Sequence, residues 1–558
     1  MRQLSVKLKS AIFGLIYVIT FGYSIAQEKP NFIFILTDDQ PYGYMGSTGN
    51  TIVKTPNLDK LAKEGVLFEN AHITSAICTP SRVSILLSQF ERKHAVNFNS
   101  GTSVSNKAWE KSYPVIMRNS GYYTGWIGKN HAPIGKGGYE SGLMEKSFDY
   151  WYAGHGHLSF YPKDRHEIFN DAVSDTQIEI INEGVEDFLD TNEQRLKGAV
   201  HFLKNRPKNK PFLLSVNFNL PHGASTSTMK LKATDNEMYK TLYRDLTIPL
   251  PKNYIAKSDI KTPKLPSDLF KVENRQIGYN YVETPEGVKE RYIRQLQAMT
   301  GIDNLIGDLR KRLKDLKLDK NTVLIFTSDH GLFMGEQGIG GKALCYEKTT
   351  HVPLIIMHPF YHKKTRGITS NALVQSIDIA PTMLKMAGIK IPETFQGKDI
   401  LPLINGGNDS VRSYVFTENL WSTQFGNPRC EAVQNKEWKY IRYYENTNFS
   451  ALKKIETANQ LGINVNKMLY SVHDSDIAMY QSFIESPLQG EEPVYEELYH
   501  LKNDPEELHN LIGQDKYASV LQELKLAWKT EITKARGTGI PNVLRYTEDS
   551  KLEAKKPH

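Results

Sequence analysis

The stretch Phe32-Ile33-Phe34-Ile35-Leu36, followed by Thr37-Asp38-Asp39, determines the fold expected of this chain of 558 residues. A continuous apolar run that ends in polar residues is typical of a strand buried on both faces of a parallel sheet. Three later runs, at residues 123–127, 212–218 and 323–326, have the same form. Each of them also ends in a polar cluster: Gly128-Lys129-Asn130-His131, Asn219-Leu220-Pro221-His222-Gly223 and Thr327-Ser328-Asp329-His330-Gly331.

Amphipathic helical patterns separate these runs, at residues 57–65, 185–203, 290–316 and 378–388. Alternating strands and helices predict an α/β sandwich, in which helices flank a large, mainly parallel central sheet. Ligands of such sheets bind beyond the carboxyl ends of the strands. Every polar cluster lies at such an end, so we expect the four clusters to converge in one cleft, which indicates an enzyme.

The two ends of the chain differ from this pattern. Residues 1–26 are typical of a secretory signal peptide, with three basic residues, an apolar run at 11–23 and the cleavage site Ser24-Ile25-Ala26. That run is short for a membrane anchor, the alternative interpretation. We therefore predict an exported protein, periplasmic or secreted, with no membrane span in the mature chain. Short aromatic strands predict a smaller C-terminal α+β subdomain, so the expected units are 1–26, a catalytic domain at 27–409, the subdomain at 410–540 and a tail at 541–558.

Composition excludes several classes of protein. Lys and Arg number 69 against 62 Asp and Glu, a formal net charge of +7 that falls to about +4 without the signal peptide. So small an excess predicts no nucleic-acid partner. Only Cys78, Cys345 and Cys430 are present, too few for a disulfide scaffold and one too many for pairing. A Cys345–Cys430 disulfide stays open, and the position of Cys345 near Lys342 predicts that it lies at the rim of the cleft.

Carboxylates gather at two of the predicted strand ends. Asp38 and Asp39 are adjacent, and Asp329 is followed by His330. Adjacent carboxylates repel each other unless a cation or a proton lies between them. Three carboxylates suit a hard divalent cation, whereas a single Asp-Asp pair is also common in turns and helix caps. Two such clusters on buried strands favour the metal site.

The segment Cys78-Thr79-Pro80-Ser81-Arg82 resembles the signature of type I sulfatases of the alkaline phosphatase-like superfamily, whose cysteine is oxidised to formylglycine (3-oxoalanine). Residues 30–512 carry further matches in the same order. Asp329-His330-Gly331 and His351-Val352-Pro353-Leu354 resemble the branch that includes iduronate-2-sulfatase-like and choline-sulfatase-like enzymes. The sequence departs from the family at Leu86-Leu87-Ser88, where Leu-Thr-Gly is usual, which puts the efficiency of the oxidation in question. The other matches are Asp38-Asp39, Thr55-Pro56-Asn57-Leu58-Asp59, Gly128-Lys129-Asn130-His131, Pro221-His222, Lys342, Glu497-Leu498-Tyr499, Asp504-Pro505 and Asn510-Leu511.

The resemblance implies a mechanism and a set of site residues. One Ca²⁺ would be held by Asp38, Asp39, Asp329, His330 and converted Cys78. A hydroxyl of the hydrated formylglycine, near Arg82, would attack the sulfur of the ester. His222 or Lys342 would protonate the leaving oxygen, and His131 would deprotonate the second hydroxyl so that sulfate is eliminated. Lys129 and Lys342 would compensate charge on the sulfate oxygens.

The predicted function is therefore hydrolysis of sulfate esters on a sulfated carbohydrate, an algal-type polysaccharide, a glycosaminoglycan or an oligosaccharide of either. His155 and His157, beside the aromatic stretch Tyr150-Trp151-Tyr152, are candidate residues of a sugar subsite in an aromatic loop. The conversion of Cys78 implies a formylglycine-generating or anaerobic sulfatase-maturating enzyme as a partner. Two alternatives stay open: a phosphatase or phosphonate monoester hydrolase of the same fold, and a sulfated-glycan-binding protein in which Cys78 is not converted.

Overall fold

The computed structural model describes residues 29–96, 102–135, 138–155, 198–222, 241–270, 279–360, 366–407, 409–420, 427–444, 492–537 and 543–545. The predicted signal peptide and most of the predicted tail lie outside these residues. No helix in the described ranges is both long and apolar enough to cross a membrane.

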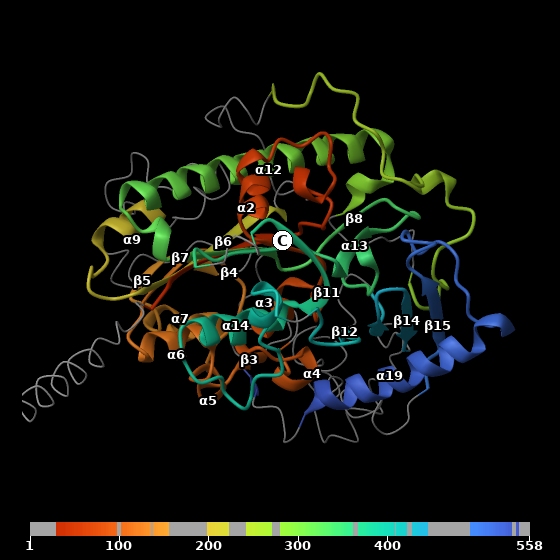
Figure 1. The fold of residues 1–558 in the computed structure, drawn as a ribbon. Helices are drawn as coiled ribbons and strands as arrows, with labels where there is room; N and C mark the ends of the chain where they lie inside the picture. Colours follow the sequence, from red (N-terminus) through yellow and green to blue (C-terminus); the bar gives the residue numbers. More distant parts are fainter. Residues whose placement is uncertain are drawn as a thin grey trace, which may run out of the picture.

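An eight-stranded sheet forms the centre of the molecule (Figure 1), in the order β11-β2-β10-β7-β1-β6-β4-β5. Strand β1 lies in the middle and pairs in parallel with β6 and β7, and all of its residues are buried. Among the described strands of this sheet, only β10 runs antiparallel to its two neighbours. The strands are β1 Asn31–Asp38, β2 Val66–His72, β4 Tyr123–Asn130, β5 Tyr150–His155, β6 Phe212–Pro221, β7 Thr322–Ser328, β10 Leu354–Met357 and β11 Ile368–Gln375.

Helices cover both faces of this sheet (Figure 1), which confirms the predicted α/β sandwich. On one face lie α2 (Pro56–Glu64), α9 (Ala199–Asn205) and α12 (Pro285–Asp315). On the other lie α3 (Cys78–Leu87), α6 (Tyr113–Asn119) and α14 (Ile379–Met386). The short helices are α4 Glu91–His94, α5 Asn106–Trp109, α7 Leu143–Lys146, α13 Glu347–Thr350 and α15 Leu401–Ile404. The 3₁₀ turns are η1 Gly46–Thr48, η2 Gly138–Ser141, η5 Lys257–Asp259, η7 Asn280–Glu283, η8 Asp319–Asn321, η10 Ser376–Asp378 and η13 Asp515–Tyr517.

The predicted helices at 57–65, 290–316 and 378–388 correspond to α2, α12 and the turn η10 with α14. Helix α12 begins earlier than predicted, at Pro285, because the Thr284 hydroxyl accepts a hydrogen bond from the Gly287 N–H and caps it. The region 185–203 is described only from residue 198, where α9 follows. Strands β2, β10 and β11 were not predicted, since their apolar residues form short or interrupted runs with no clear alternation of apolar and polar positions.

The prediction of an aromatic loop at Tyr150-Trp151-Tyr152 is wrong. These residues begin β5, the edge strand of the large sheet, which pairs in parallel with β4. Trp151 and Tyr152 are buried, and Trp151 stacks on Trp126 of β4 with ring centroids 6.4 Å apart. Because β5 pairs with β4, these aromatic rings are buried in the core and are not available to stack on a sugar.

The C-terminal subdomain is built on a second, antiparallel sheet, as the sequence predicted. Its strands are β12 (Val415–Asn419), β13 (Cys430–Gln434), β14 (Trp438–Tyr443) and β15 (Tyr495–His500), paired in that order. Helix α19 (Ala518–Arg536) packs Leu524, Trp528 and Ile532 against this sheet. Two small ribbons complete the described strands: β3 (Thr102–Val104) with β16 (Val543–Arg545), and β8 (Phe333–Met334) with β9 (Gly340–Gly341).

A buried ionic cluster joins α4 to the small sheet. Arg92 of α4 pairs with Glu418 of β12, Nε to Oε2 at 3.0 Å, and with Glu431 of β13. Glu91 is also fully buried, and its carboxyl accepts a hydrogen bond from the Ser75 hydroxyl at 2.8 Å. Burial, and then the charge of Glu418, raise the pKa of Glu91 well above its ordinary value of 4.5. Glu91 is therefore protonated in the folded protein over a range of pH in which the unfolded chain has lost that proton.

We expect Glu91→Gln to make the free energy of unfolding less dependent on pH. Because the folded-state pKa is raised, the stabilisation from this proton is complete below pH 4.5 and is lost as the pH rises through the folded pKa. Glutamine cannot ionise, so the variant should match the wild type near pH 4.5 and exceed it increasingly at higher pH. Urea unfolding across a pH series measures this, and a constant difference between the two proteins would contradict it.

Candidate active site

Polar side chains from several elements meet at the carboxyl edge of the large sheet. The strands that carry them, β7, β1, β6 and β4, are neighbours, and α3 begins directly beside this edge with Cys78 as its first residue. All of the predicted site residues with described side chains are buried here. They are Asp38 and Asp39 from β1 and its end, Cys78 and Arg82 from α3, Lys129 and His131 from β4 and its end, His222 after β6, Asp329 and His330 after β7, and Lys342 after β9.

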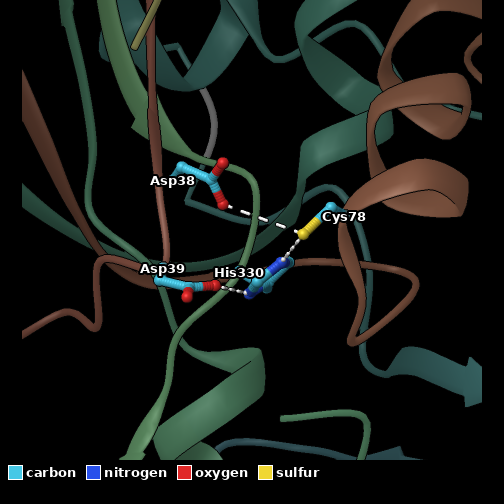
Figure 2. A group of neighbouring side chains, drawn as sticks. All are labelled: Asp38, Asp39, Cys78 and His330. Atoms are coloured by element: carbon cyan, nitrogen blue, oxygen red, sulfur yellow. Dashed lines mark hydrogen bonds and ion pairs between the residues drawn. The ribbon is translucent and has the colours of Figure 1, made fainter. Parts of the chain in front are cut away.

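Four of these side chains form a possible cation site (Figure 2). Asp38, Asp39, Cys78 and His330 each offer one ligand atom, and these atoms all lie within 4.8 Å of one another. The Cys78 Sγ is 3.8 Å from the Asp38 Oδ1 and 3.0 Å from the His330 Nε2. Asp39 directly follows β1, and its backbone is in the left-handed region at φ 61°, a rare conformation for a residue other than glycine.

This donor set suits a divalent cation. The His330 Nδ1 lies 3.2 Å from the Asp39 Oδ1, and the Asp39 Oδ2 is buried without a hydrogen-bond partner. Burial raises the pKa of Asp39, and the charge of Lys342 opposes it. For His330, burial lowers the pKa but the charges of Asp329 and Cys78 raise it, to about 9. A cation bound among these groups would replace the proton of His330 and use the remaining oxygen of Asp39.

Asp329 borders this group and contacts Arg82. The Arg82 Nε donates to the Asp329 Oδ2 at 2.8 Å, and its Nη2 lies 3.5 Å from the Asp38 Oδ2. The Asp329 Oδ1 accepts from the backbone N–H of Asp39 at 3.3 Å and is 3.6 Å from the His330 Nε2. The guanidinium therefore compensates two carboxylates at once.

Two buried lysines place their ammonium groups at the same point. The Lys342 Nζ donates to the Asp39 Oδ1 at 2.8 Å and to the Cys78 Sγ at 3.0 Å, and the Lys129 Nζ donates to Asp38. Burial lowers the pKa of Lys342, but the charges of Asp39 and Cys78 raise it well above its ordinary value. Lys342 therefore stays charged and can hold an anion beside Cys78.

His131 and His222 stand next to these cations. Burial, followed by the charges of Lys129 and Arg82, lowers the pKa of His131 well below its ordinary value. Burial and the charge of Lys342 do the same for His222, whose Nε2 lies 3.7 Å from the Asp39 Oδ2. Both imidazoles are therefore neutral at pH 7, and each can accept a proton.

Two residues at the site were not found from the sequence. Tyr279 is buried and makes a side-chain hydrogen bond with Lys342. The Asn427 Nδ2 donates to the backbone carbonyl of Lys342 at 3.0 Å. Tyr279 lies in the Pro- and Lys-rich region 249–287, which the sequence predicts as a long surface excursion that lines the cleft, but no motif marks Tyr279 itself. The same region is partly anchored, because Leu265, Leu269 and Phe270 are buried.

A side-chain hydrogen bond fixes each end of the helix that carries Cys78, one to the segment after β7 and one to the turn η10. The sequence predicts a helix at 81–87, and the structure begins it three residues earlier, at Cys78. The Ser81 hydroxyl donates to the backbone carbonyl of Asp329 at 2.6 Å. The helix ends at Leu87, and the next residue, Ser88, has a left-handed backbone at φ 52°, a conformation that glycine adopts more easily. The Ser88 hydroxyl donates to the Ile377 carbonyl at 2.7 Å. The departure from Leu-Thr-Gly thus places a hydrogen-bonding side chain at the helix end.

The other predicted positions lie elsewhere. Cys345 is not at the rim of the cleft, because it is fully buried in an apolar cluster with Phe333 and Tyr499. Its Sγ is 3.5 Å from that of Cys430, and both are free thiols in this structure. His155 is the last residue of β5, but its side chain and the whole of His157 lie outside the described residues. The sugar-subsite prediction for these histidines therefore stays a prediction.

Comparison with known proteins finds family models and relatives that match most of the chain. Residues 30–389 match the family model described as Sulfatase, and residues 335–467 match that described as N-sulphoglucosamine sulphohydrolase, C-terminal. An N-acetylglucosamine-6-O-sulfatase of Bacteroides thetaiotaomicron is 25% identical over 544 residues, which cover 89% of this chain and 85% of that protein. An ulvan-active sulfatase of Formosa agariphila is 28% identical over 507 residues, with 90% and 79% covered.

The fold also matches solved structures. One is a structure in complex with its substrate D-glucosamine-2-N,6-O-disulfate, which superposes with a TM-score of 0.63 at 21% identity and covers 92% of this chain and 99% of that one. A phosphonate monoester hydrolase from Silicibacter pomeroyi gives a TM-score of 0.63 at 18% identity, covering 91% and 96%. At these identities the likeness concerns the fold alone.

Proposed function

The chain belongs to the sulfatase family and is a sulfuric ester hydrolase. From this premise we propose that it removes sulfate from a sulfated glycan and that residue 78 is the reacting group. The observation that carries the proposal is the set of contacts around the Cys78 Sγ. Three groups lie within 3.8 Å of this sulfur: the ammonium group of Lys342 and two side chains of types that bind metals, His330 and Asp38. A buried structural thiol has no need of such surroundings, whereas a reacting centre for an anionic ester requires them.

We propose that Cys78 is oxidised to formylglycine and that Asp38, Asp39, Asp329 and His330 hold one Ca²⁺. A maturation enzyme would supply the oxidant for the conversion of the thiol. The hydrated aldehyde provides a hydroxyl nucleophile and a second hydroxyl, and the cation provides positive charge beside them. Carboxylate oxygens are the ligands that Ca²⁺ prefers, which supports calcium over softer metals.

The remaining residues have proposed roles that follow from their positions. Lys129 and Lys342 bind the sulfate oxygens and compensate the charge that develops on them. Arg82, fixed by Asp329, keeps positive charge next to residue 78. Lys342, which stays charged, or His222 after it has taken up a proton, donates that proton to the oxygen of the departing alcohol, and neutral His131 accepts the proton that must leave before sulfate is released.

The substrate class proposed is a sulfated polysaccharide or its oligosaccharides. Two relatives support it by their described activities, one on N-acetylglucosamine 6-O-sulfate and one on ulvan. Export, which the sequence of residues 1–26 predicts, would place the enzyme where such polymers occur. We propose a periplasmic or secreted location on that ground.

The function is tested by measuring released sulfate. The mature chain, co-expressed with a formylglycine-generating enzyme, is incubated with sulfated oligosaccharides from ulvan and from glycosaminoglycans and with N-acetylglucosamine 6-sulfate. Release from at least one of these is expected, and mass spectrometry of the tryptic peptide should show an aldehyde at residue 78. A chain that carries the aldehyde yet releases sulfate from none of them would overturn the glycan assignment.

Removal of the metal should abolish most of the activity. Dialysis against a chelator is expected to lower the rate of sulfate release by about 100-fold or more, because a bound cation contributes several kcal/mol to such reactions. Added Ca²⁺ should restore the rate and raise the melting temperature of the metal-free chain.

Two matched variants locate this metal effect. Asp39→Asn should remove the Ca²⁺-dependent rise in melting temperature. Asp303→Asn is the control, because Asp303 is equally buried but accepts its hydrogen bonds at α2, from the Leu58 N–H at 2.7 Å. The control should keep the rise, and a rise that persists in Asp39→Asn would place the cation elsewhere.

A further inference from the structure

A second hollow, here called the distal cavity, lies outside the candidate active site. Its volume is about 680 Å³, within the range of roughly 300–1,000 Å³ typical of ligand pockets. Its lining includes Tyr42, Tyr44 and Tyr292 and residues of the turns at 434–437 and 501–505 of the C-terminal subdomain. Within the described part of the chain, its lining includes none of the candidate catalytic residues.

The distal cavity is close to the reacting centre but separate from it. Its nearest wall begins at Pro41, two residues after Asp39 and so within ~7 Å of it along the backbone. A buried cluster lies between the two sites, since it contains both Tyr279, which contacts Lys342, and Leu332, which lines the cavity.

The ionisable groups of the cavity walls are largely paired with one another. Glu347 pairs with buried Lys439 at 2.7 Å, and Lys348 lies between Glu336 at 3.7 Å and Glu506 at 3.1 Å. Burial lowers the pKa of His351 to about 4, so this ring is neutral. Glu507, 2.9 Å from Lys439, is a fourth carboxylate against the two lysines, so the walls bring no excess of positive charge to the cavity.

The rim, in contrast, has an excess of positive charge. Lys252, Lys436 and Lys502 line the opening and are exposed, and Glu437 is the one exposed acidic residue among the described lining residues. The Lys436 Nζ contacts the Asn371 Oδ1 at 3.1 Å, a neutral partner that leaves its charge uncompensated. Three lysines against one glutamate favour an anionic ligand.

The walls fit a sugar ring. The Tyr42 ring stacks on His351 with centroids 4.2 Å apart and planes 13° apart, and His351 stacks in turn on His72 at 5.1 Å. This fixed stack offers a flat surface, and the amide groups of Gln434 and Asn435, which also make hydrogen bonds within the protein, add polar groups to the lining. Apolar walls with a few polar groups and a cationic rim match a sugar that carries sulfate or carboxylate groups.

We propose that the distal cavity binds an anionic sugar unit of a glycan chain whose sulfate ester is hydrolysed at Cys78. The inference rests on the proposed function and extends it, because it makes a longer chain the preferred substrate. A unit held in the cavity keeps the rest of the chain near the reacting centre and so raises its effective concentration there. Long substrates should gain from this contact and short ones should not.

The double variant Lys436→Ala/Lys502→Ala tests the proposal. Its probes are a sulfated octasaccharide, heparin-derived or ulvan-derived, that the wild type hydrolyses, and the shortest sulfated sugar that it hydrolyses. The KM for the octasaccharide is expected to rise about tenfold, the effect of losing roughly 1.4 kcal/mol of binding free energy. The kcat/KM for the short substrate should not change. The control is Lys320→Ala/Lys390→Ala, which removes two exposed lysines that do not line the cavity.

An unchanged KM for the octasaccharide would overturn the proposal, and so would an equal loss on the short substrate or in the control. Binding to the Cys78→Ala chain provides a readout that does not need turnover. Isothermal titration calorimetry with the same octasaccharide should show affinity about tenfold lower when the two lysines are also replaced. If the wild type released no sulfate from any sugar, the proposed function would fail, whereas this titration would still decide whether the cavity binds.

Discussion

Replacement of Cys78 by alanine is expected to lower the rate of sulfate release by ~10⁴-fold or more, since loss of a covalent nucleophile has effects of this size. Alanine cannot be oxidised to an aldehyde and has no group that can attack sulfur. Lys342 can still bind an anion in this variant, and His330 and the two aspartates stay in place, but no side chain is left to attack the sulfur. Sulfate release under substrate saturation, measured by ion chromatography, gives the rate directly.

Cys345→Ala is the matched control for this variant. It removes an equally buried sulfur that contacts Cys430 rather than Lys342. Its activity should stay close to that of the wild type, even if some stability is lost with the packing of the side chain. Equal loss of activity in both variants would show that a structural effect, and not the loss of a nucleophile, explains the result for Cys78.

Arg82→Ala should destabilise the protein by about 3–5 kcal/mol, because removal of one partner leaves a buried charge uncompensated. Arg82 is 2% exposed and serves both Asp329, at 2.8 Å, and Asp38, at 3.5 Å. We also expect loss of most of the activity, since the two carboxylates lose the group that holds them in place. Urea unfolding of the metal-free chain measures the first effect, and sulfate release measures the second.

Two further variants test the expected destabilisation by Arg82→Ala. Arg118→Ala removes an exposed pair with Asp149, at 2.9 Å and with side chains 37% and 24% exposed, and should cost at most ~1 kcal/mol. The double variant Arg82→Ala/Asp329→Asn removes both members of the buried pair and should recover part of the stability lost in Arg82→Ala. Equal costs for Arg82 and Arg118 would refute the assigned role of the buried pair.

Much of the fold could be predicted because the signals are local. The apolar runs that became β1, β4, β6 and β7 lie in successive residues, and each ends where a polar cluster begins. The amphipathic patterns of α2, α12 and α14 repeat within a few turns. Strands β2, β10 and β11 lack such a pattern and acquire their conformation by pairing with partners far along the chain, as Leu354 does with Phe68. The antiparallel direction of β10 is a property of that pairing.

In the candidate site, too, local signals could be predicted from the sequence and contacts between distant residues could not. The sequence by itself determined which residue types stand at the strand ends, and the motif around Cys78 identified the family, because both are encoded in adjacent positions. Only the tertiary structure decided that Asp329 contacts Arg82, that Tyr279 and Asn427 contact Lys342, that Trp151 faces the core, and that Cys345 lies beside Cys430. These contacts join residues that are tens to hundreds of positions apart, and they form only when burial of the apolar strands brings distant segments together.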